Sequence, residues 1–361
     1  MHEKKALIAM SGGVDSSVAA HLMVQEGYSC IGATMRLFDD SILPEAQEST
    51  CCSLDDVEDA RSVAHALGMP YYVFNFTGDF QEKVIEKFIR CYECGATPNP
   101  CIDCNRYLKF EHLLDRARVL DCDYVVTGHY ARIQQDPQTG RYLLYKATDL
   151  SKDQSYVLYS LTQEQLAHVK LPLGGMTKEQ ARVVAEEAGF INAKKRDSQD
   201  ICFVPDGDYV AFMERYTKKQ YPKGKFLDLE GNVVGEHQGA VSYTIGQRKG
   251  LGLAMGEPVY VCSKDMAANT VTVGPDAALF SASLLANDWN WFPFPELTEP
   301  IRVNAKVRYR HNPQPATVYP EENGFARVVF DEPQRAITTG QAVVLYQDDM
   351  VVGGGTITEV L

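Results

Sequence analysis

The most constraining feature of the sequence is a short apolar run that leads into a glycine-rich turn and then into a helical pattern. Residues 6–10 are Ala-Leu-Ile-Ala-Met, and a continuous apolar run of this length is typical of a strand buried on both faces of a parallel sheet. From Val14 onward the apolar residues recur at helical spacing, and Gly27 lies where a helix of that length would end. This strand–turn–helix unit predicts an α/β fold for the N-terminal part.

The alternation of strands and helices continues along the first part of the chain. Apolar runs predict further strands at residues 30–35, 71–76 and 124–127, and helical patterns cover residues 54–67, 80–90 and 105–120. Ser53-Leu-Asp-Asp resembles a capping box that opens the first of these helices. The alternation predicts a doubly wound parallel sheet that binds ligands at its carboxyl edge.

After residue 205 the pattern changes to short strands separated by turn residues. We expect strands at residues 240–244, 259–262, 270–273, 301–308, 326–330 and 342–345. The chain is therefore expected to contain an α/β domain at 1–205, a small central β-rich domain at 206–280 and a barrel-like β domain at 281–361.

Composition sets broad limits on what the chain can be. Its 361 residues suggest two or three domains, and 45% hydrophobic with 23% charged residues are ordinary for a soluble globular protein. No apolar run approaches the roughly 20 residues of a membrane span, so we expect a cytoplasmic protein with no membrane partner. The net charge of −13 argues against a protein that coats nucleic acid indiscriminately. Ten cysteines without a secretory signal favour metal or sulfur chemistry over disulfides.

The loop Ser11–Ser17, with the sequence Ser-Gly-Gly-Val-Asp-Ser-Ser, is the first segment whose residues are suited to bind a ligand. It lies between a buried strand and a helix start, where backbone N–H groups converge on an anion. We therefore expect a phosphate or pyrophosphate here. The loop lacks the lysine of the Walker A pattern, which disfavours a kinase-like protein. Two hydroxyls and a carboxylate at the same corner disfavour a plain βα turn.

This loop resembles the PP-loop of ATP pyrophosphatases, and five later blocks resemble signatures of the tRNA-specific 2-thiouridylase family. They are Thr-Pro-Asn-Pro-Cys-Ile-Asp-Cys-Asn at 97–105, Thr-Gly-His-Tyr-Ala-Arg at 127–132, Lys-Asp-Gln-Ser-Tyr at 152–156, Asp-Ser-Gln-Asp-Ile-Cys-Phe at 197–203 and Tyr-Thr-Ile-Gly-Gln-Arg-Lys-Gly-Leu-Gly at 243–252. The resemblance spans nearly the whole chain. It implies ATP-dependent 2-thiolation of the wobble uridine of tRNA, in which the uracil O2 is adenylated and a cysteine persulfide supplies sulfur, giving 2-thiouridine, AMP and pyrophosphate.

The resemblance also implies partners and binding residues. Expected partners are tRNAs of the Lys, Glu and Gln type and a cysteine desulfurase or sulfur-relay protein. ATP, with Mg²⁺, is expected to contact Ala9, Met10, Ser11, Gly12, Gly13, Val14, Asp15, Ser16, Met35 and Gly128. The target base is expected at Asn99, Pro100 and Cys101. Other tRNA contacts are expected at His129, Lys152, Asp153, Gln154, Arg308, Tyr309 and Gln341.

Two cysteines match the catalytic positions of the family. The resemblance assigns Cys104 as the nucleophile-side thiol and Cys202 as the thiol that carries the persulfide. Their neighbours favour thiolates. A helix is predicted to start at Asn105, directly after Cys104, and Lys194-Lys-Arg precedes Cys202.

Cys101 introduces an alternative sulfur route, because many family members have Asp at this position. Cys101, Cys104 and Cys202 together could ligate a [4Fe–4S] cluster with one open iron. Cys91-x-x-Cys94 followed by Cys101-x-x-Cys104 also mimics a zinc-site spacing, although the gap between the pairs is short. The sequence leaves both sulfur routes open. The persulfide relay is favoured because two cysteines already account for the chemistry.

Although the chain is acidic overall, local groups of basic residues favour RNA binding. Residues 301–310 alternate, so that one face of a strand would carry Arg302, Asn304, Lys306, Arg308 and Arg310. Residues 190–250 hold ten Lys and Arg against eight Asp and Glu. Such local excess suits phosphate contacts, although a solvated charged face is the alternative. A small-molecule ligase would not need these patches, and an RNA-binding module would not need the pyrophosphate loop.

Overall fold

The computed structural model describes residues 4–38, 54–195 and 201–361. The chain divides into two compact units. Unit 1 comprises residues 1–85, 100–207 and 348–352, and unit 2 comprises residues 86–99, 208–347 and 353–361. The predicted capping box at Ser53 lies outside the described residues.

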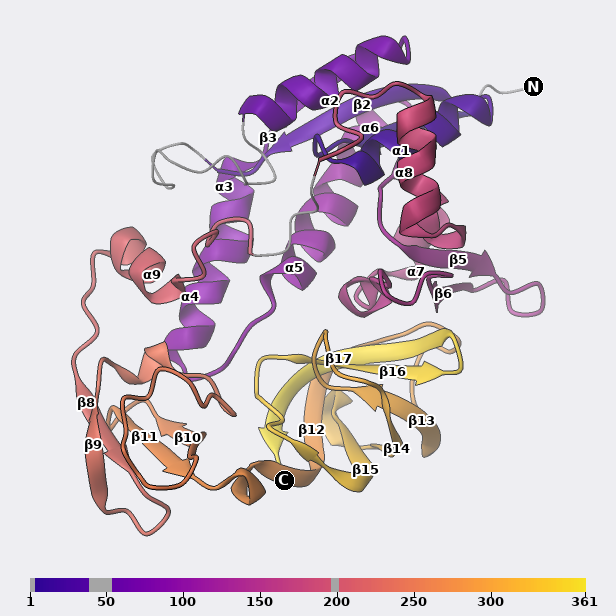
Figure 1. Cartoon of the computed structure of the whole chain (residues 1–361). Coiled ribbons are helices and arrows are strands. Elements are labelled where there is room, and N and C mark those ends of the chain that lie inside the picture. The colour runs from indigo at the N-terminus through magenta and orange to yellow at the C-terminus, as the bar shows by residue number, and fades with distance from the viewer. Residues whose placement is uncertain (1–3, 39–53, 196–200) are drawn as a thin grey trace. The chain divides into compact units, whose positions relative to one another are not determined.

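Unit 1 is built on a parallel sheet with the strand order β3-β2-β1-β4-β7 (Figure 1). Its strands are β1 (Lys5–Ala9), β2 (Ser29–Arg36), β3 (Tyr71–Asn75), β4 (Tyr124–Val126) and β7 (Val169–Lys170). β1 pairs in parallel with both β2 and β4, so the strand order reverses at β1. The predicted doubly wound parallel sheet is confirmed, and ligand sites in such sheets lie at this reversal.

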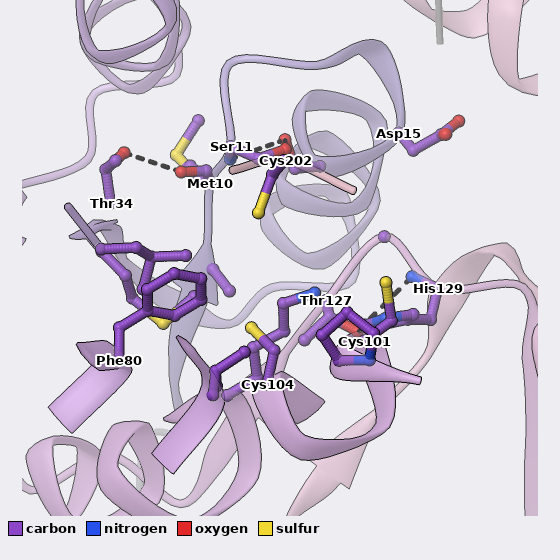
Figure 2. Close-up of a pocket in the computed structure, with 18 of the residues that line it drawn as sticks. Met10, Ser11, Asp15, Thr34, Phe80, Cys101, Cys104, Thr127, His129 and Cys202 are labelled. Atoms are coloured by element: carbon purple, nitrogen blue, oxygen red, sulfur yellow. Dashed lines mark hydrogen bonds between the residues drawn. The ribbon is translucent and has the colours of Figure 1, made fainter. Parts of the chain in front are cut away.

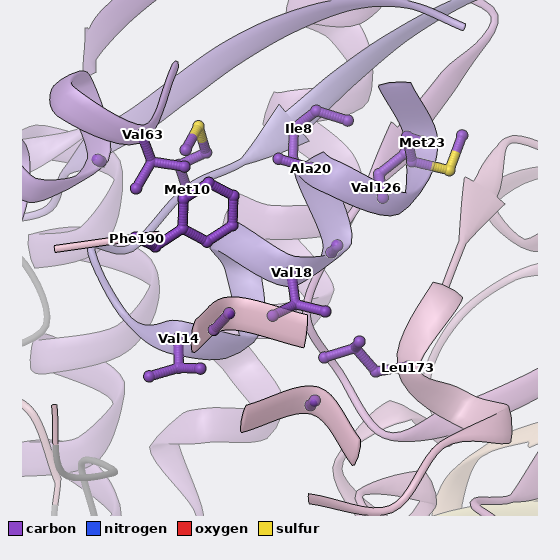
Figure 3. Packing of buried hydrophobic residues seen from close by; sticks show 14 of the residues in the cluster. Ile8, Met10, Val14, Val18, Ala20, Met23, Val63, Val126, Leu173 and Phe190 are labelled. Atoms are coloured by element: carbon purple, nitrogen blue, oxygen red, sulfur yellow. The ribbon is translucent and has the colours of Figure 1, made fainter. Parts of the chain in front are cut away.

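One face of the sheet is covered by α1 (Val14–Gln25), α2 (Leu54–Ala66) and α8 (Lys178–Glu187). Figure 3 shows this core, which includes Ile8 of β1, Val18 of α1 and Val63 of α2. Ile8 and its neighbour Leu7 are both completely buried, and adjacent residues of a strand point to opposite faces. Burial on both faces explains why this strand appears in the sequence as a continuous apolar run.

The two helices predicted after β3 are longer than expected, and each contains a π-helical segment. The first runs through α3 (Thr77–Phe80), η1 (Gln81–Ile85) and α4 (Glu86–Glu93), and the second through α5 (Pro100–Asp103), η2 (Cys104–His112) and α6 (Leu113–Val119). The prediction that a helix starts at Asn105, after Cys104, is wrong. The helix begins at Pro100, because proline fits the first helical position, where its missing N–H is not needed.

The rest of unit 1 holds elements that the sequence pattern does not reveal. β5 (Ala131–Gln135) and β6 (Tyr142–Lys146) form an antiparallel hairpin, and Met350 and Val351 at the start of β17 (Met350–Val360) pair with β6. The connecting segments are η3 (Ser155–Leu158), α7 (Gln163–Ala167) and η4 (Pro172–Gly175).

Unit 2 contains α9 (Tyr209–Thr217), which the sequence pattern does not predict, and a four-stranded sheet ordered β10-β11-β8-β9. Its strands are β8 (Gly224–Leu227), β9 (Val233–His237), β10 (Tyr260–Asp265) and β11 (Thr270–Gly274). The strand predicted at 240–244 is wrong, since Ala240–Ser242 forms the 3₁₀ turn η5. Ala240 and Tyr243 pack into the core around Phe226, so their apolar character reflects burial in a loop rather than strand alternation.

The second sheet of unit 2 is a closed barrel, which confirms the barrel-like domain (Figure 1). The strand order is β12-β15-β14-β13-β16-β17, and β12 also pairs with β17. The new strands are β12 (Phe280–Trp291), β13 (Ile301–Lys306), β14 (Gln314–Pro320), β15 (Ala326–Arg335) and β16 (Ala342–Gln347), with the 3₁₀ turns η6 (Asp276–Leu279) and η7 (Glu322–Gly324). The predicted strand at 301–308 ends at Lys306, so Arg308 and Arg310 follow it. Within the described residues, no helix is long and apolar enough to cross a membrane.

Two adjacent glycines of η4 provide a matched test of packing in unit 1. A Cβ on Gly174 would lie 1.9 Å from the carbonyl oxygen of Ala131, whereas a Cβ on Gly175 would meet nothing within 4 Å. We expect Gly174→Ala to lower the free energy of unfolding by about 2–3 kcal/mol, the usual cost of overpacking. Gly175→Ala should change it by less than about 0.5 kcal/mol. Urea denaturation of both variants checks the contrast, and equal midpoints would contradict it.

Candidate active site

A cavity of about 320 Å³ opens at the carboxyl edge of the parallel sheet of unit 1 (Figure 2). Its walls come from the segments that follow β1, β2 and β4, from the start of the helix at Pro100, and from residues 201–203. It brings together many predicted site residues: Ala9, Met10, Ser11, Asp15, Ser16, Met35, Pro100, Cys101, Cys104, Gly128, His129, Gln154 and Cys202. Gly12, Gly13 and Val14 belong to the same loop but do not line the cavity.

The loop after β1 leaves the first amides of α1 open to a ligand. Gly13 is the N-cap residue, and no side chain caps the helix. The hydroxyls of Ser16 and Ser17 donate back to the carbonyl oxygen of Gly13, at 3.0 and 3.1 Å. Unpaired N–H groups and the positive end of the helix dipole make this corner suitable for a phosphate.

Two glycines allow neighbouring backbone segments to touch this loop. Gly12 has a φ of +71°, and a Cβ there would lie 2.3 Å from the carbonyl oxygen of Asp56. Gly128 follows β4, and a Cβ there would lie 2.7 Å from the carbonyl carbon of Asp15. Side chains at these two positions would push the loop away from α2 and from β4.

The carboxylate of Asp15 is held by two residues that the sequence analysis does not identify. Lys178 Nζ donates to both carboxylate oxygens, at 2.8 and 2.9 Å, and the hydroxyl of Tyr130 donates to one of them at 2.8 Å. Figure 2 shows the Asp15 carboxylate directed away from the three labelled cysteines. The capping box at Thr177, which precedes Lys178, could have indicated a helix start. Nothing in the sequence indicates that Lys178 lies close to the loop.

The turn after α8 forms hydrogen bonds with the same loop. Asn192 Nδ2 donates to the carbonyl oxygen of Gly12 and to the hydroxyl of Ser17, both at 2.9 Å. Lys195 Nζ lies 2.7 Å from Asp56 and 2.6 Å from Asp59. The prediction that Lys195 favours a Cys202 thiolate is therefore corrected, because its charge is matched by two carboxylates of α2. Arg196 lies outside the described residues.

Cys101, Cys104 and Cys202 all reach the cavity, but their exposure differs (Figure 2). Cys104 is buried, Cys202 is half-buried and Cys101 is exposed. Among the residues that the structure describes, no three His, Cys, Asp or Glu side chains are grouped so that they could hold a metal ion. Cys101, Cys104 and Cys202 are thus not gathered as metal ligands in this arrangement of the described residues.

His129 is buried beside the cavity. Its Nδ1 lies 2.7 Å from the Thr127 hydroxyl. Burial, together with the positive charge of Lys109, holds the pKa of His129 well below its usual range, so the ring is neutral at neutral pH. Gln154 accepts a hydrogen bond from the backbone N–H of Tyr130 at 2.9 Å.

Lys152 and Asp153 do not line the cavity. Asp153 instead stabilises its own turn by accepting hydrogen bonds from the backbone N–H groups of Ala147 and Ser155, at 3.0 and 3.2 Å.

The remaining predicted tRNA contacts lie in unit 2. Arg308 is half-buried and donates to the carbonyl oxygen of Arg335 at 2.7 Å, whereas Tyr309 is exposed. Gln341 donates to the carbonyl oxygens of Thr97 and Pro98, at 2.8 and 3.4 Å, directly before Asn99.

The positive charge on the face of β13 that carries Arg302 is partly neutralised. Both terminal nitrogens of Arg302 bind the Asp331 carboxylate at 2.7 Å. The basic excess at residues 190–250 is likewise reduced, because Lys219 pairs with Glu93 at 2.7 Å.

Family models match three successive parts of the chain. A tRNA methyl transferase HUP domain matches residues 4–206, a tRNA methyl transferase PRC-barrel domain 210–275, and an aminomethyltransferase beta-barrel domain 281–357. A parallel sheet with an uncapped, glycine-rich loop at the switch point is typical of nucleotide-binding α/β proteins.

Curated relatives match over the full length. tRNA-specific 2-thiouridylases named MnmA are 51% identical in Clostridioides difficile, over 99% of both chains, and 53% identical in Symbiobacterium thermophilum, over 98% of this chain and 92% of that one. The chain therefore belongs to the tRNA-specific 2-thiouridylase family, whose members are ATP-using enzymes. Among solved structures, a 4-thiouridine synthetase–RNA complex with bound ATP is 18% identical, with a TM-score of 0.34, over 60% of this chain and 51% of that one.

The buried His129 should make stability depend on pH. The unfolded chain binds a proton on this ring near the ordinary histidine pKa of 6.5, whereas the folded chain does not. Stability is therefore lost as the pH falls through 6.5. We expect His129→Asn to reduce the loss between pH 6.5 and 5.5 by about 1 kcal/mol.

Urea unfolding at both pH values checks this expectation, with His65→Asn on the exposed side of α2 as the control. His237 is buried with a lowered pKa as well, so part of the pH dependence should remain in the His129 variant. A pH dependence identical to that of the parent would contradict the assignment.

Proposed function

We propose that the protein is a tRNA-uridine 2-sulfurtransferase that adenylates the wobble uridine and replaces its O2 with sulfur from a cysteine persulfide. One observation carries the proposal: the nucleotide loop, Cys104 and Cys202 line a single cavity. Adenylation needs a pyrophosphate site, and sulfur transfer needs thiols within reach of the activated carbon. A ligase acting on a small molecule would need the loop but not the two cysteines.

In the proposed reaction, the uracil O2 attacks the α-phosphorus of ATP and pyrophosphate leaves. The open amides of α1 are suited to hold that leaving group, and Mg²⁺ bound with the phosphates would supply further charge neutralisation. The terminal sulfur of a Cys202 persulfide then attacks C2, and AMP departs with the former O2. Cys104 as thiolate attacks Cys202 Sγ, which releases 2-thiouridine and leaves a Cys104–Cys202 disulfide. An external thiol reductant restores the two thiols.

The proposed RNA contacts extend beyond the cavity. Pro100 and Cys101 line it beside Cys104, which supports the stretch Asn99–Cys101 as the site of a base splayed out of the anticodon loop. His129, Lys152, Asp153, Gln154, Arg308, Tyr309 and Gln341 remain proposed tRNA contacts.

The partners and setting complete the proposal. The tRNAs would be of the Lys, Glu and Gln type, and the sulfur source a cysteine desulfurase or relay protein, in the cytoplasm. We also propose functional domains at 1–205, 206–280 and 281–361, of which the first carries the chemistry and the last contacts tRNA.

Substitution of the two catalytic thiols separates the half-reactions. We expect Cys104→Ser and Cys202→Ser to abolish 2-thiouridine formation. In a single turnover, tRNA-dependent release of the first equivalent of pyrophosphate should stay within about threefold of the parental rate, because the nucleotide loop is untouched. The measurements are pyrophosphate release and mass spectrometry of tRNA nucleosides, with added desulfurase and cysteine. Pyrophosphate release that does not depend on tRNA would favour a small-molecule ligase.

Within the same experiment, Cys101→Asp distinguishes the two sulfur routes. A persulfide relay does not require Cys101, so this variant should keep most of its thiolation activity. The cluster alternative requires all three thiolates. Stoichiometric iron in an anaerobically reconstituted parent, together with an inactive Cys101→Asp variant, would replace the relay with a cluster mechanism.

The salt dependence of tRNA binding tests the basic residues after β13. Replacing Arg308 and Arg310 with Ala should weaken binding and flatten the slope of log K against log salt by about 2, roughly one unit for each phosphate that is no longer neutralised. Arg302→Ala is the matched control, because Arg302 is already paired with Asp331. Filter binding across a salt series gives the slopes. If the double variant retains the parental slope, these residues form a solvated charged face.

A further inference from the structure

We infer that Lys178 is a positioning residue of the nucleotide loop, which acts by neutralising Asp15 so that the loop presents only hydrogen-bond donors to the phosphates of ATP. The inference rests on the proposed function, because it assumes that this loop holds those phosphates. It gives Asp15 a different role from that of a direct metal ligand.

The contacts around Asp15 leave its charge matched. Lys178 Nζ bridges both carboxylate oxygens, at 2.8 and 2.9 Å, and the side chain of Lys178 is only 7% exposed. The Tyr130 hydroxyl adds a third hydrogen bond, and the Lys178 ammonium lies 6.0 Å from the centre of the Tyr130 ring. These three hydrogen bonds occupy most of the roughly four lone-pair sites of the carboxylate.

The position of Lys178 in its own helix is unfavourable without this partner. Lys178 is the first residue of α8, after the N-cap Thr177, and a cation at a helix N-terminus is repelled by the helix dipole. Burying an ammonium group adds a desolvation cost. The Asp15 carboxylate offsets both costs. Asp149 also fixes the helix start by accepting a hydrogen bond from the Lys178 backbone N–H at 3.1 Å.

The pair has a direct consequence for phosphate binding. Asp15 lies in the first turn of α1, where an uncompensated carboxylate would cancel the positive end of the helix and repel a polyphosphate. With Lys178 in place, the charge of the pair is zero. Removing both charges should therefore be tolerated better than removing either one.

The test is a double-mutant cycle with Lys178→Met, Asp15→Asn and the combined D15N/K178M variant. We expect Lys178→Met to raise the KM for ATP about tenfold, the effect of one partly buried charge at a helix terminus, with a smaller change in kcat and unchanged tRNA binding. The double variant should return to within about threefold of the parental KM. Lys5→Met is the matched control, because Lys5 pairs with Asp121 at 2.8 Å in the same unit.

Two outcomes would overturn the inference: a parental KM in Lys178→Met, or a double variant as impaired as Asp15→Asn, which would make Asp15 a direct ligand. If Lys178→Met does not fold, the comparison of the double variant with Asp15→Asn decides the question. Equilibrium binding of Mg·ATP without tRNA is measured in parallel. A parent that binds ATP but releases no pyrophosphate with tRNA would refute the proposed function, while the binding data would still test Lys178.

Discussion

The close approach of three backbone segments at the reversal of strand order governs the organisation of unit 1. The loop between β1 and α1 is in contact with α2 through Gly12 and with the segment after β4 through Gly128, at distances that no side chain would permit. Asn192 fixes the loop from a third direction. The proposed phosphate site would depend on this rigidity, because backbone amides bind an anion well only when their directions are set in advance.

The helix that begins at Pro100 brings thiol chemistry to the same edge of the sheet. Cys101 lies in its first turn and Cys104 opens the π-helical segment η2. π-helical turns are frequent at functional sites, where the extra residue per turn re-aims side chains. The exposed Cys101 and the buried Cys104 thus come from neighbouring turns of one element. A base held near the helix start would meet the two thiols in different surroundings.

The sequence predicts those features that depend on local pattern. Burial on both faces produces the apolar run of β1. The order of motifs singles out the loop, Cys104 and Cys202, and residues of all three line one cavity. The helix start at Pro100 escapes prediction because the dipeptide Asn-Pro is also typical of a loop. The segment at 240–244 is misassigned because burial in a loop produces the same residues as a strand.

Long-range ion pairs are the least predictable features. Lys178 and Asp15 are 163 positions apart, and Asp331 comes from a different strand than the Arg302 that it neutralises. No periodic pattern in a sequence indicates which distant charged residues will pair. A basic row in a sequence therefore overstates the positive charge that a folded surface presents.

The attachment of residues 96–99 has a mechanical consequence. Thr97 N–H donates to the carbonyl oxygen of Thr339, Gln341 holds the carbonyl oxygens of Thr97 and Pro98, and Gly340 packs against Ala96. This stretch is therefore fastened to a turn of the barrel, and the boundary between the two units falls at the next peptide bond, between Asn99 and Pro100. A side chain at Gly340 would collide with Ala96 and Thr97, so a substitution in this barrel turn would displace the stretch that precedes Pro100.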